Sequence, residues 1–432
     1  MIPTEVLPEV LGGRWLSSGV GTLRGASIDT RTLAAGQAFF AMSGARVDGH
    51  AFLDRATDAG AGVAIVEREV TPPEGLAVLL VSSTRTALWN LAEWYRARLT
   101  ARVIAVMGSN GKTTTVRMMA SVLNQSMHAH ASARSFNNAL GLPLTLLNCS
   151  SEAEALVCEL GEGEPGALAR YTGLAKPDMA VVTSVGRAHV GELGGMEAVQ
   201  REFSDALAAM ASHAEAFVPD ELSWLHAPCR TTFGITRAWH TEGRTHLELA
   251  DGSTWSVPVV GLHNASNASA VIAVARGLGV PDASIAAGLD AFEPAEMRLA
   301  VREIGGASVL VDCYNANPDS MAAALHTLAG VGKDSHKVAI IGDMLELGTD
   351  SLAWHREIGA LAAACADTCI FVGPSARAAF EAAGTGAWFA TVAEAACAAG
   401  QLARPGSVLL LKASRGMKLE SLLEAMQQAA VA

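Results

Sequence analysis

Seven consecutive residues, Gly108-Ser-Asn-Gly-Lys-Thr-Thr114, combine small side chains with one amine and three hydroxyls. An apolar run, Val103–Met107, precedes them and helix-like spacing follows, which predicts a strand, a tight turn and a helix. Such a turn lets backbone N–H groups surround a phosphate at the positive end of a helix. Lys112 can reach the β- and γ-phosphates, and the Thr113 hydroxyl can coordinate Mg²⁺. The predicted nucleoside triphosphate site comprises Gly108, Ser109, Asn110, Gly111, Lys112, Thr113 and Thr114.

The spacing of this loop differs from the general pattern Gly-x-x-x-x-Gly-Lys-[Ser/Thr]. That pattern requires glycine at position 106, which is Val106 here. The first glycine is Gly108, so the loop reads Gly-x-x-Gly-Lys-Thr-Thr. On spacing alone, a glycine-rich turn without a ligand remains the alternative.

Two polar residues follow predicted strands of the same region. Glu159 ends the run Ala155–Glu159, and His189 closes the segment after the run Met179–Thr183. Ligands of open α/β sheets bind outside the carboxyl ends of the strands. A carboxylate beside a triphosphate is a suitable Mg²⁺ ligand. We therefore predict metal binding for Glu159 and a metal or phosphate role for His189, against an exposed loop glutamate and a structural histidine as alternatives.

A third polar group lies farther along the chain. The segment Asp312-Cys-Tyr-Asn-Ala-Asn-Pro-Asp-Ser320 directly follows an apolar run, and so many hydrogen-bonding groups at one strand end predict ligand contact. Arg298 could reach phosphates across a domain interface or form a surface ion pair. Asn264 and Asn267 open an apolar helix, where their position favours capping, with base recognition as the alternative.

The elements that must position these residues predict an α/β fold. Short apolar runs alternate with helical patterns, which indicates βαβ units and mostly parallel sheets. We expect three domains: residues 1–98, a central phosphate-loop domain at 99–294, and a Rossmann-like, doubly wound domain at 295–432. The expected strands of the last domain contain residues 308–312, 337–341, 369–372 and 407–411.

The composition of the chain excludes some classes of binding partner. A net charge of −12 argues against nucleic acid or an anionic membrane as the main partner. The chain lacks a continuous apolar run of about 18 residues, so we expect no membrane span. The start of the chain has no signal-peptide pattern, and seven scattered cysteines are typical of reduced thiols. We expect a cytoplasmic monomer.

Taken together, these motifs resemble the Mur ligases, ATP-dependent amide-forming enzymes of peptidoglycan precursor synthesis. Within that family the chain is most similar to the type that adds D-alanyl-D-alanine to a UDP-N-acetylmuramoyl-tripeptide. The most type-specific stretch is Tyr-Asn-Ala-Asn-Pro-Asp-Ser-Met at residues 314–321. The other matching stretches are 29–31, 44–50, 108–114, 137–146, 159–161, 188–189, 263–267, 342–348 and 412–417.

The resemblance implies a three-domain architecture and a set of roles. Lys112, His189 and Asp312 are the implied catalytic residues, and ATP and Mg²⁺ the cofactors. Thr113 and Glu159 are expected to hold one Mg²⁺ and His189 a second, while Asn264, Asn267, Arg298 and Asp312 contact the nucleotide. The implied substrate-binding residues are Asp29, Thr30, Arg31, Asp48, His50, Asn137, Asn138, Tyr314, Asn315, Asn317, Asp319 and Ser320. The implied partners are a UDP-linked sugar-peptide, or another carboxylate, and D-Ala-D-Ala, or another amine.

One position departs from the family pattern. Beyond the Ala-His motif the family carries Ala-Lys-x-Glu, with a carbamylated lysine that helps to bind the second Mg²⁺. Ungapped counting from His189 places Phe203 at the lysine and Asp205 at the glutamate. Three explanations remain open: Glu202 or Asp205 supplies the carboxylate, one Mg²⁺ suffices, or the chain is a paralogue with another substrate in a specialised pathway. A nucleotide-binding protein without catalysis is the remaining alternative.

Overall fold

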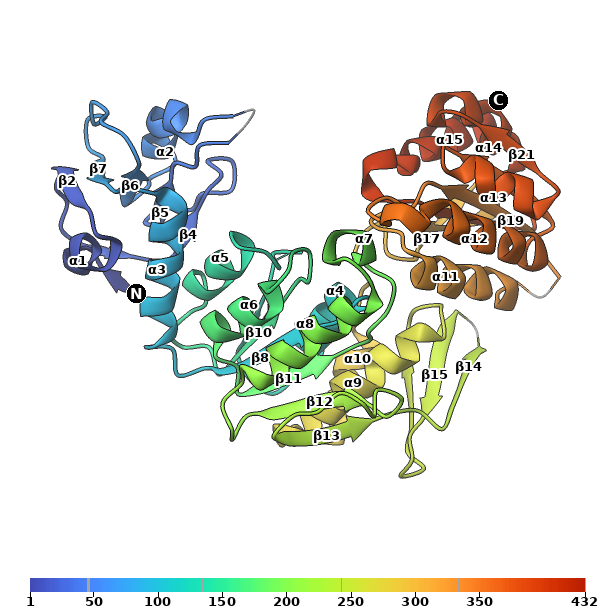
Figure 1. The fold of residues 1–432 in the computed structure, drawn as a ribbon, viewed down its shortest axis with the longest axis horizontal. Helices are drawn as coiled ribbons and strands as arrows, with labels where there is room; N and C mark the ends of the chain where they lie inside the picture. The colour runs from blue at the N-terminus through green and yellow to red at the C-terminus, as the bar shows by residue number, and fades with distance from the viewer. Residues whose placement is uncertain (45–46, 134, 242, 333, 432) are drawn as a thin grey trace.

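The computed structural model describes residues 1–44, 47–133, 135–241, 243–332 and 334–431. Three sheet-containing bodies follow one another along the chain, and the first and last stand on opposite sides of the central one (Figure 1). Ala45 and Arg46, which belong to the segment 44–50 used above, lie outside the described residues. In the described part of the chain, no helix is long and apolar enough to cross a membrane.

The N-terminal body contains a five-stranded sheet in the order β2-β7-β6-β5-β4, in which only β2 pairs antiparallel. A small β1–β3 pair lies apart from it. Its elements are β1 Ile2–Pro3, η1 Thr4–Val6, α1 Leu7–Leu11, β2 Arg14–Ser17, β3 Thr22–Leu23, β4 Ala26–Ser27, β5 Ala38–Phe40, η2 Gly49–Phe52, α2 Leu53–Asp58, β6 Val63–Val66, β7 Ala77–Leu80 and α3 Thr84–Arg96.

The central body is built on a parallel six-stranded sheet in the order β13-β12-β11-β8-β10-β9, with an antiparallel β14-β15-β16 sheet beside it. Its strands are β8 Arg102–Met107, β9 Ala129–Ala131, β10 Ala155–Glu159, β11 Met179–Val182, β12 Glu215–Pro219, β13 Cys229–Phe233, β14 Arg237–Thr241, β15 Arg244–Glu248 and β16 Thr254–Val257. Its helices are α4 Lys112–Leu123, α5 Gly141–Leu147, α6 Ala167–Ala175, α7 Val190–Leu193, α8 Met196–Ala208, α9 His263–Gly277 and α10 Asp282–Asp290.

The C-terminal body has a six-stranded sheet in the order β17-β18-β22-β19-β20-β21, parallel except for β17. Its strands are β17 Ala300–Ile304, β18 Ala307–Asp312, β19 His336–Gly342, β20 Thr368–Val372, β21 Ala387–Phe389 and β22 Ser407–Lys412. Its helices are α11 Pro318–Gly330, η3 Gly348–Asp350, α12 Ser351–Cys365, α13 Ala376–Ala383, α14 Val392–Leu402, η4 Arg415–Met417, η5 Leu419–Ser421 and α15 Leu422–Val431.

Strand β8 shows why the central strands read as continuous apolar runs. Val103 and Met107 face one hydrophobic cluster, whereas Ile104 and Val106 face another on the opposite side of the sheet. A parallel strand covered by helices on both faces needs apolar residues at every position. The predicted α/β, three-domain architecture with a parallel phosphate-loop sheet and a Rossmann-like C-terminal part is therefore confirmed.

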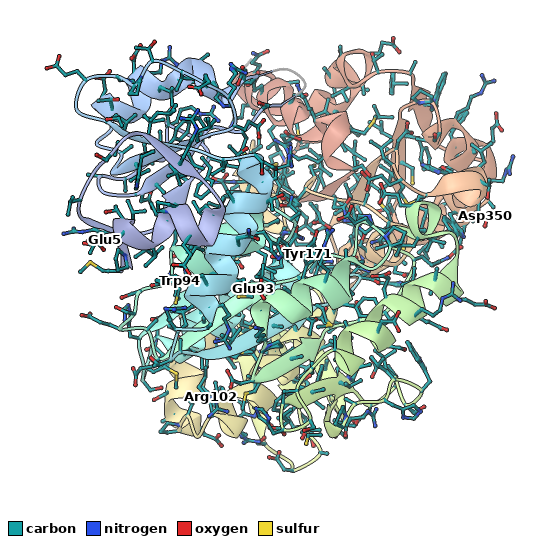
Figure 2. The ribbon with its side chains drawn as sticks, turned by 60° about the vertical axis from the view of Figure 1, so that its left-hand side comes forward. Glu5, Glu93, Trp94, Arg102, Tyr171 and Asp350 are labelled. Carbon is teal, nitrogen blue, oxygen red and sulfur yellow. The ribbon has the colours of Figure 1, made fainter. Side chains whose placement is uncertain are left out.

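Helix α3 joins the first body to the central one. Figure 2 shows Glu93 and Trp94 of α3 close to Tyr171 of α6, and the rings of Trp89 and Tyr171 lie 6.1 Å apart. Asn148, just after α5, accepts a hydrogen bond from the Ala26 backbone and donates one back to it. These contacts hold the N-terminal body against the side of the central body.

Candidate functional site

The phosphate loop connects β8 to α4 and is fixed by the neighbouring strand β11. Gly108 and Gly111 have φ of 149° and 85°, values that only glycine adopts readily. A Cβ added to Gly108 would lie 2.0 Å from Thr183 Oγ1. The Asn110 N–H donates to Ser184 Oγ at 3.0 Å, and Thr183 Oγ1 donates to Asn110 O. The shortened loop is therefore held in shape before any ligand binds.

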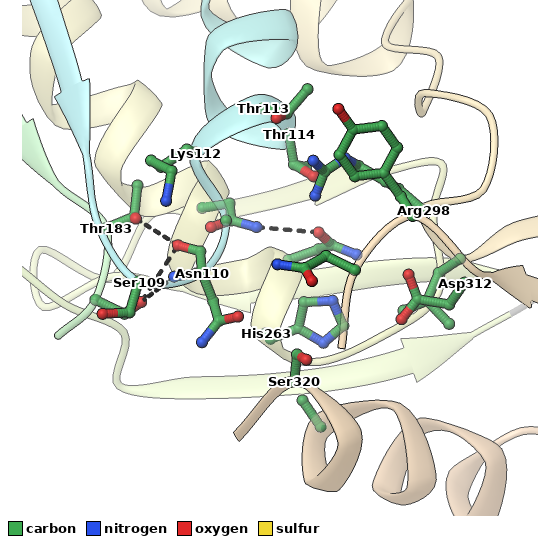
Figure 3. A pocket seen from close by; sticks show the side chains of 18 of the residues that line it. Ser109, Asn110, Lys112, Thr113, Thr114, Thr183, His263, Arg298, Asp312 and Ser320 are labelled. Carbon is green, nitrogen blue, oxygen red and sulfur yellow. Dashed lines mark hydrogen bonds between the residues drawn. The ribbon is translucent and has the colours of Figure 1, made fainter. Parts of the chain in front are cut away.

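A cavity of about 590 Å³ opens above this loop, between the central and C-terminal bodies. In Figure 3, Lys112, Thr113 and Thr114 lie on one side and Arg298 and Asp312 on the other. The predicted residues that line the cavity are Ser109, Asn110, Gly111, Lys112, Thr113, Thr114, Asn137, Asn138, Glu159, His189, Asn264, Asn267, Arg298, Asp312, Tyr314, Asn315, Asp319 and Ser320.

Glu159 is a suitable cation ligand at the end of β10. It is 1% exposed, and Asn137 Nδ2 donates to its Oε1 at 2.9 Å, whereas Oε2 has no partner among the described residues. Burial raises the pKa of Glu159, and the nearby charges of Lys112 and Arg298 oppose this rise. Thr113, whose hydroxyl contacts Ser135 Oγ at 3.3 Å, lines the same cavity. An unpartnered carboxylate oxygen and a hydroxyl on one cavity wall fit the oxygen ligands that Mg²⁺ prefers.

Sequence reasoning missed Glu162, which is paired with the lysine of the loop. Its side chain is 0% exposed, and Lys112 Nζ donates to its Oε2 at 2.7 Å and to Gly108 O. Its other oxygen has no partner among the described residues. The only signal in the sequence is an acidic residue in the Gly-rich segment after Glu159.

The start of α9 forms the floor of the cavity. Asn264 Nδ2 donates to Val260 O, and Asn267 Nδ2 donates to Asn264 Oδ1. A Cβ on Gly111 would lie 2.4 Å from Asn267 Oδ1, so Asn267 packs directly against the phosphate loop. Beside them, burial lowers the pKa of His263 to about 4, which keeps the imidazole neutral. These side chains offer neutral polar groups, of the kind that a nucleotide base requires.

Two residues of the C-terminal body and its linker face the cavity with opposite charges. The guanidinium of Arg298 lies 4.3 Å from the centre of the Tyr314 ring. Both residues lie outside the parallel sheet of the central body. Asp312 accepts from Lys412 Nζ at 2.6 Å, and that nitrogen also donates to Asn315 O. Arg298 is thus placed to meet an anion, whereas Asp312 is already neutralised by a buried lysine.

The segment after Asp312 also fixes the C-terminal body on the central one. Asn317 and Ser320 form a capping box at the start of α11, and Asn317 Nδ2 donates to Asn110 Oδ1 at 2.9 Å. Asp319 accepts from the Arg187 backbone and side chain, at 2.7 and 2.8 Å. Substrate binding by these residues stays a prediction, because the structure gives each an intramolecular partner.

The predicted residues of the N-terminal body do not belong to this cavity. Asp29 pairs with Arg31, and Asp48 with the half-exposed Arg68. Both ring nitrogens of His50 have partners, because Nδ1 lies 2.7 Å from Asp48 Oδ1 and Nε2 accepts from the Glu67 N–H. Their role toward a substrate, and that of Thr30, stays a prediction.

Helix α8 carries the residue that departs from the family pattern. Phe203 is 0% exposed and packs in the hydrophobic core, on the buried face of α8. The carboxylate of Glu202 accepts from the N–H groups of Gly166 and Leu168 at the start of α6, and Asp205 is exposed. Neither carboxylate lines the cavity. Of the three open explanations, a cation ligand supplied by Glu202 or Asp205 therefore gains no support from this arrangement.

Comparison with known proteins finds three family models that match this chain. Three family models match: "Mur ligase family, catalytic domain" at residues 22–96, "Mur ligase middle domain" at 106–275 and "Mur ligase, glutamate ligase domain" at 297–415. Together they cover most of the chain. The chain belongs to the Mur ligase family.

The most similar relatives indicate which type of Mur ligase the chain resembles. The UDP-N-acetylmuramoyl-tripeptide–D-alanyl-D-alanine ligase of Bacillus subtilis is 34% identical over 93% of both chains, and that of Escherichia coli is 31% identical over 98% and 97%. A crystal structure of MurF from Acinetobacter baumannii superimposes with a TM-score of 0.88 at 31% identity, over 99% of both chains. MurF of Thermotoga maritima in complex with ADP gives 0.81 at 27% identity, over 94% and 98%.

Proposed function

We propose that this chain is an ATP-dependent ligase that adds D-alanyl-D-alanine to UDP-N-acetylmuramoyl-tripeptide. The observation that carries the proposal is the cavity itself, in which the phosphate loop faces the segment 312–320 across two bodies. Relatives named for this activity align with nearly the whole chain, which supports the same substrates here.

The reaction joins a carboxylate to an amine in two steps. A carboxylate oxygen of the tripeptide attacks the γ-phosphorus of ATP, ADP leaves, and an acyl phosphate forms. The amine of the dipeptide then attacks the acyl carbon, phosphate leaves with the bonding electron pair, and the amine loses a proton. The product is an amide, and the bond of ATP that is broken is the β–γ anhydride, whose γ-phosphoryl group ends as phosphate.

The residues of the cavity contribute charge and position. Lys112, at the start of α4, neutralises charge that builds on the oxygens of the transferring phosphoryl group. The backbone N–H groups of the loop and the neutral side chains of Asn264 and Asn267 hold the nucleotide. Because the cavity lies between two bodies, closure over it would exclude the water that hydrolyses an acyl phosphate.

Mg²⁺ is part of the proposal. Thr113 and Glu159 would hold it, since one offers a hydroxyl and the other an unpartnered, buried carboxylate oxygen. When bound, the ion would neutralise phosphate charge beside Lys112.

An ADP-release assay with purified protein tests the proposal. We expect Mg²⁺-dependent ADP formation that requires both UDP-N-acetylmuramoyl-tripeptide and D-Ala-D-Ala, and an amide product of the corresponding mass. ATP binding without ADP formation, whatever amine and UDP-linked acceptor are supplied, would refute ligase activity.

Phe203 favours one second candidate, a ligase of the same reaction class with another amine or carboxylate. Its apolar, buried side chain cannot bind a cation, so the second cation site that the resemblance implies is altered at this position. A panel of amines in the same assay separates the two. A higher kcat/KM for another amine than for D-Ala-D-Ala would select the second candidate.

A further inference from the structure

A buried lysine interrupts the apolar run of strand β22 in the C-terminal sheet. This strand lies between β18 and β19, and its residues 408–411 are apolar and buried. Lys412 ends the strand and is only 2% exposed. Lysine is almost never buried to this extent without a partner. The carboxyl end of a parallel strand is also where α/β sheets bind their ligands, so the partner of this ammonium bears on the site.

The partner of Lys412 is Asp312, which lines the nucleotide cavity. Parallel pairing sets the two residues opposite one another at the ends of β22 and β18. Lys412 Nζ donates to Asp312 Oδ2 at 2.6 Å and to Asn315 O at 2.9 Å, so one ammonium fixes both the carboxylate and the backbone that follows it. Asp312 Oδ1 has no hydrogen-bond partner among the described residues. The pair therefore leaves one carboxylate oxygen for a ligand.

The chemistry of a carboxylate oxygen restricts which part of a nucleotide it can bind. It only accepts hydrogen bonds, and so do the phosphates of ATP. The donors that ATP offers are its ribose hydroxyls and the amino group of its base. The neutral side chains of Asn264 and Asn267 on the cavity floor suit the base, whereas Asp312 lies across the cavity from Lys112 (Figure 3). A ribose hydroxyl is the donor that remains for Asp312 Oδ1.

Stability alone does not account for the pair. Apolar residues in place of a buried ion pair are often neutral or stabilising, because two charges no longer have to leave water. Buried charged groups with a specific partner are, in contrast, typical of ligand sites. An unpaired carboxylate at the position of Asp312 would repel the phosphates of a nucleotide in the same cavity, and the ammonium of Lys412 cancels that charge.

We propose, on the basis of the function proposed above, that Lys412 is a positioning residue for the nucleotide and acts through Asp312. Its ammonium holds Oδ2 of the carboxylate and the carbonyl of Asn315, so that Oδ1 faces a ribose hydroxyl in a fixed direction. Both hydrogen bonds point away from the ligand. Lys412 therefore acts on the nucleotide through the carboxylate and not by touching a phosphate.

Selectivity for the ribose hydroxyls tests this role. Calorimetric titration of the full chain in Mg²⁺, without the other substrates, measures Kd for ATP and for 2′,3′-dideoxy-ATP, which lacks both hydroxyls. We expect the wild type to bind ATP at least about tenfold more tightly, as for one hydrogen bond to a charged group. Lys412→Met should lose most of this preference. A merely structural lysine would weaken the binding of both nucleotides equally and leave their ratio unchanged.

A double-mutant cycle shows whether Lys412 acts through Asp312. The preference for ATP should already be small in Asp312→Asn, and adding Lys412→Met should reduce it no further. The double variant contains neither charge of the pair, so it supplies this comparison even where Lys412→Met alone, with an unpaired carboxylate, does not fold. A further loss of preference in the double variant would reveal a role independent of Asp312 and overturn the proposal.

Lys337→Met is the matched control. Lys337 lies on the neighbouring strand β19, donates to Ala329 O and does not line the cavity. It should keep the wild-type preference. A folded Lys412→Met protein with that preference intact, or a wild type that binds both nucleotides equally, would overturn the positioning role and leave the proposed function standing. A wild type that binds no ATP would overturn both.

Discussion

At the scale of single residues, the nucleotide site contains an anion next to its own lysine. Glu162 is fully buried and accepts from Lys112 Nζ, which also donates to Gly108 O. A buried ion pair is costly to desolvate and is held together strongly once formed. In the absence of nucleotide, the pair therefore keeps Lys112 folded toward the loop, and the phosphates of ATP compete with Glu162 for the ammonium.

Glu162→Gln should tighten nucleotide binding and slow the reaction. Removing the carboxylate charge frees Lys112 for the phosphates, and a charge-assisted hydrogen bond of ~1.5 kcal/mol corresponds to about a tenfold lower Kd for ATP. The lysine also loses the partner that positions it, so kcat should fall. Calorimetric titration with a non-hydrolysable ATP analogue measures Kd, and steady-state ADP release measures kcat.

Glu164→Gln serves as the control for this variant. Glu164 pairs with Arg170 at the surface, and exposed pairs of this kind contribute ~0–1 kcal/mol. Its Kd and kcat should match those of the wild type. A Glu162→Gln protein with unchanged Kd would show that Lys112 does not have to leave Glu162 to bind phosphate.

At the scale of elements, helix α11 contacts the phosphate loop through Asn317, the residue that caps its start. Asn317 Oδ1 accepts from the Ser320 N–H at 2.9 Å, while Asn317 Nδ2 donates to Asn110 Oδ1. One side chain thus caps the start of a helix of the C-terminal body and contacts the loop of the central body.

Two substitutions separate these roles. Asn317→Asp keeps an N-cap acceptor but cannot donate to Asn110, whereas Asn317→Ala loses both interactions. We expect Asn317→Ala to lower the free energy of unfolding by ~1 kcal/mol and Asn317→Asp to leave it nearly unchanged. Both should raise the KM for ATP. Urea unfolding followed by circular dichroism gives stability, and an equal stability loss in the two variants would contradict the capping role.

Elements with a strong local pattern could be predicted from the sequence. The strand β8, the loop and α4 follow from spacing within about twenty residues, and Glu159 follows from its place at a strand end. The short strands β17 and β21 were not predicted, because three to five partly exposed residues carry little period-two signal. Strands of the six-stranded sheets are buried on both faces of the sheet, so they appear in the sequence as continuous apolar runs that could be recognised.

Contacts between distant segments could not be predicted in this way. Glu162 lies 50 positions from Lys112, and Glu346 lies far from His189, so no local pattern joins either pair. Asn317 was predicted to bind substrate because polar groups cluster there, but clustering alone does not distinguish a ligand site from a helix cap. The cap is a local contact between residues three apart, whereas the contact of Asn317 with Asn110 requires the docking of two domains, which spacing does not encode.

At the scale of the whole molecule, the nucleotide cavity exists only where two bodies meet, and Arg187 joins them. It donates to Asp319 of α11 and to Glu357 of α12, and its side chain is 27% exposed. The N-terminal body, with its predicted substrate residues, stands across the central body from this contact (Figure 1).

Arg187→Ala should release the C-terminal body from the central one. Loss of ion pairs of roughly 1 kcal/mol each shifts the population of closed molecules about fivefold per pair. Spin labels on two exposed native thiols, Cys229 of β13 and Cys397 of α14, report the distance between the bodies. Burial raises the pKa of the thiols of Cys149 and Cys369, which slows the labelling of these two residues. We expect a longer, broader distance distribution in Arg187→Ala, partly reversed by ATP. Glu357→Gln, which keeps the Asp319 contact, should give a much smaller change, and identical distributions in Arg187→Ala and the wild type would show that other contacts hold the two bodies together.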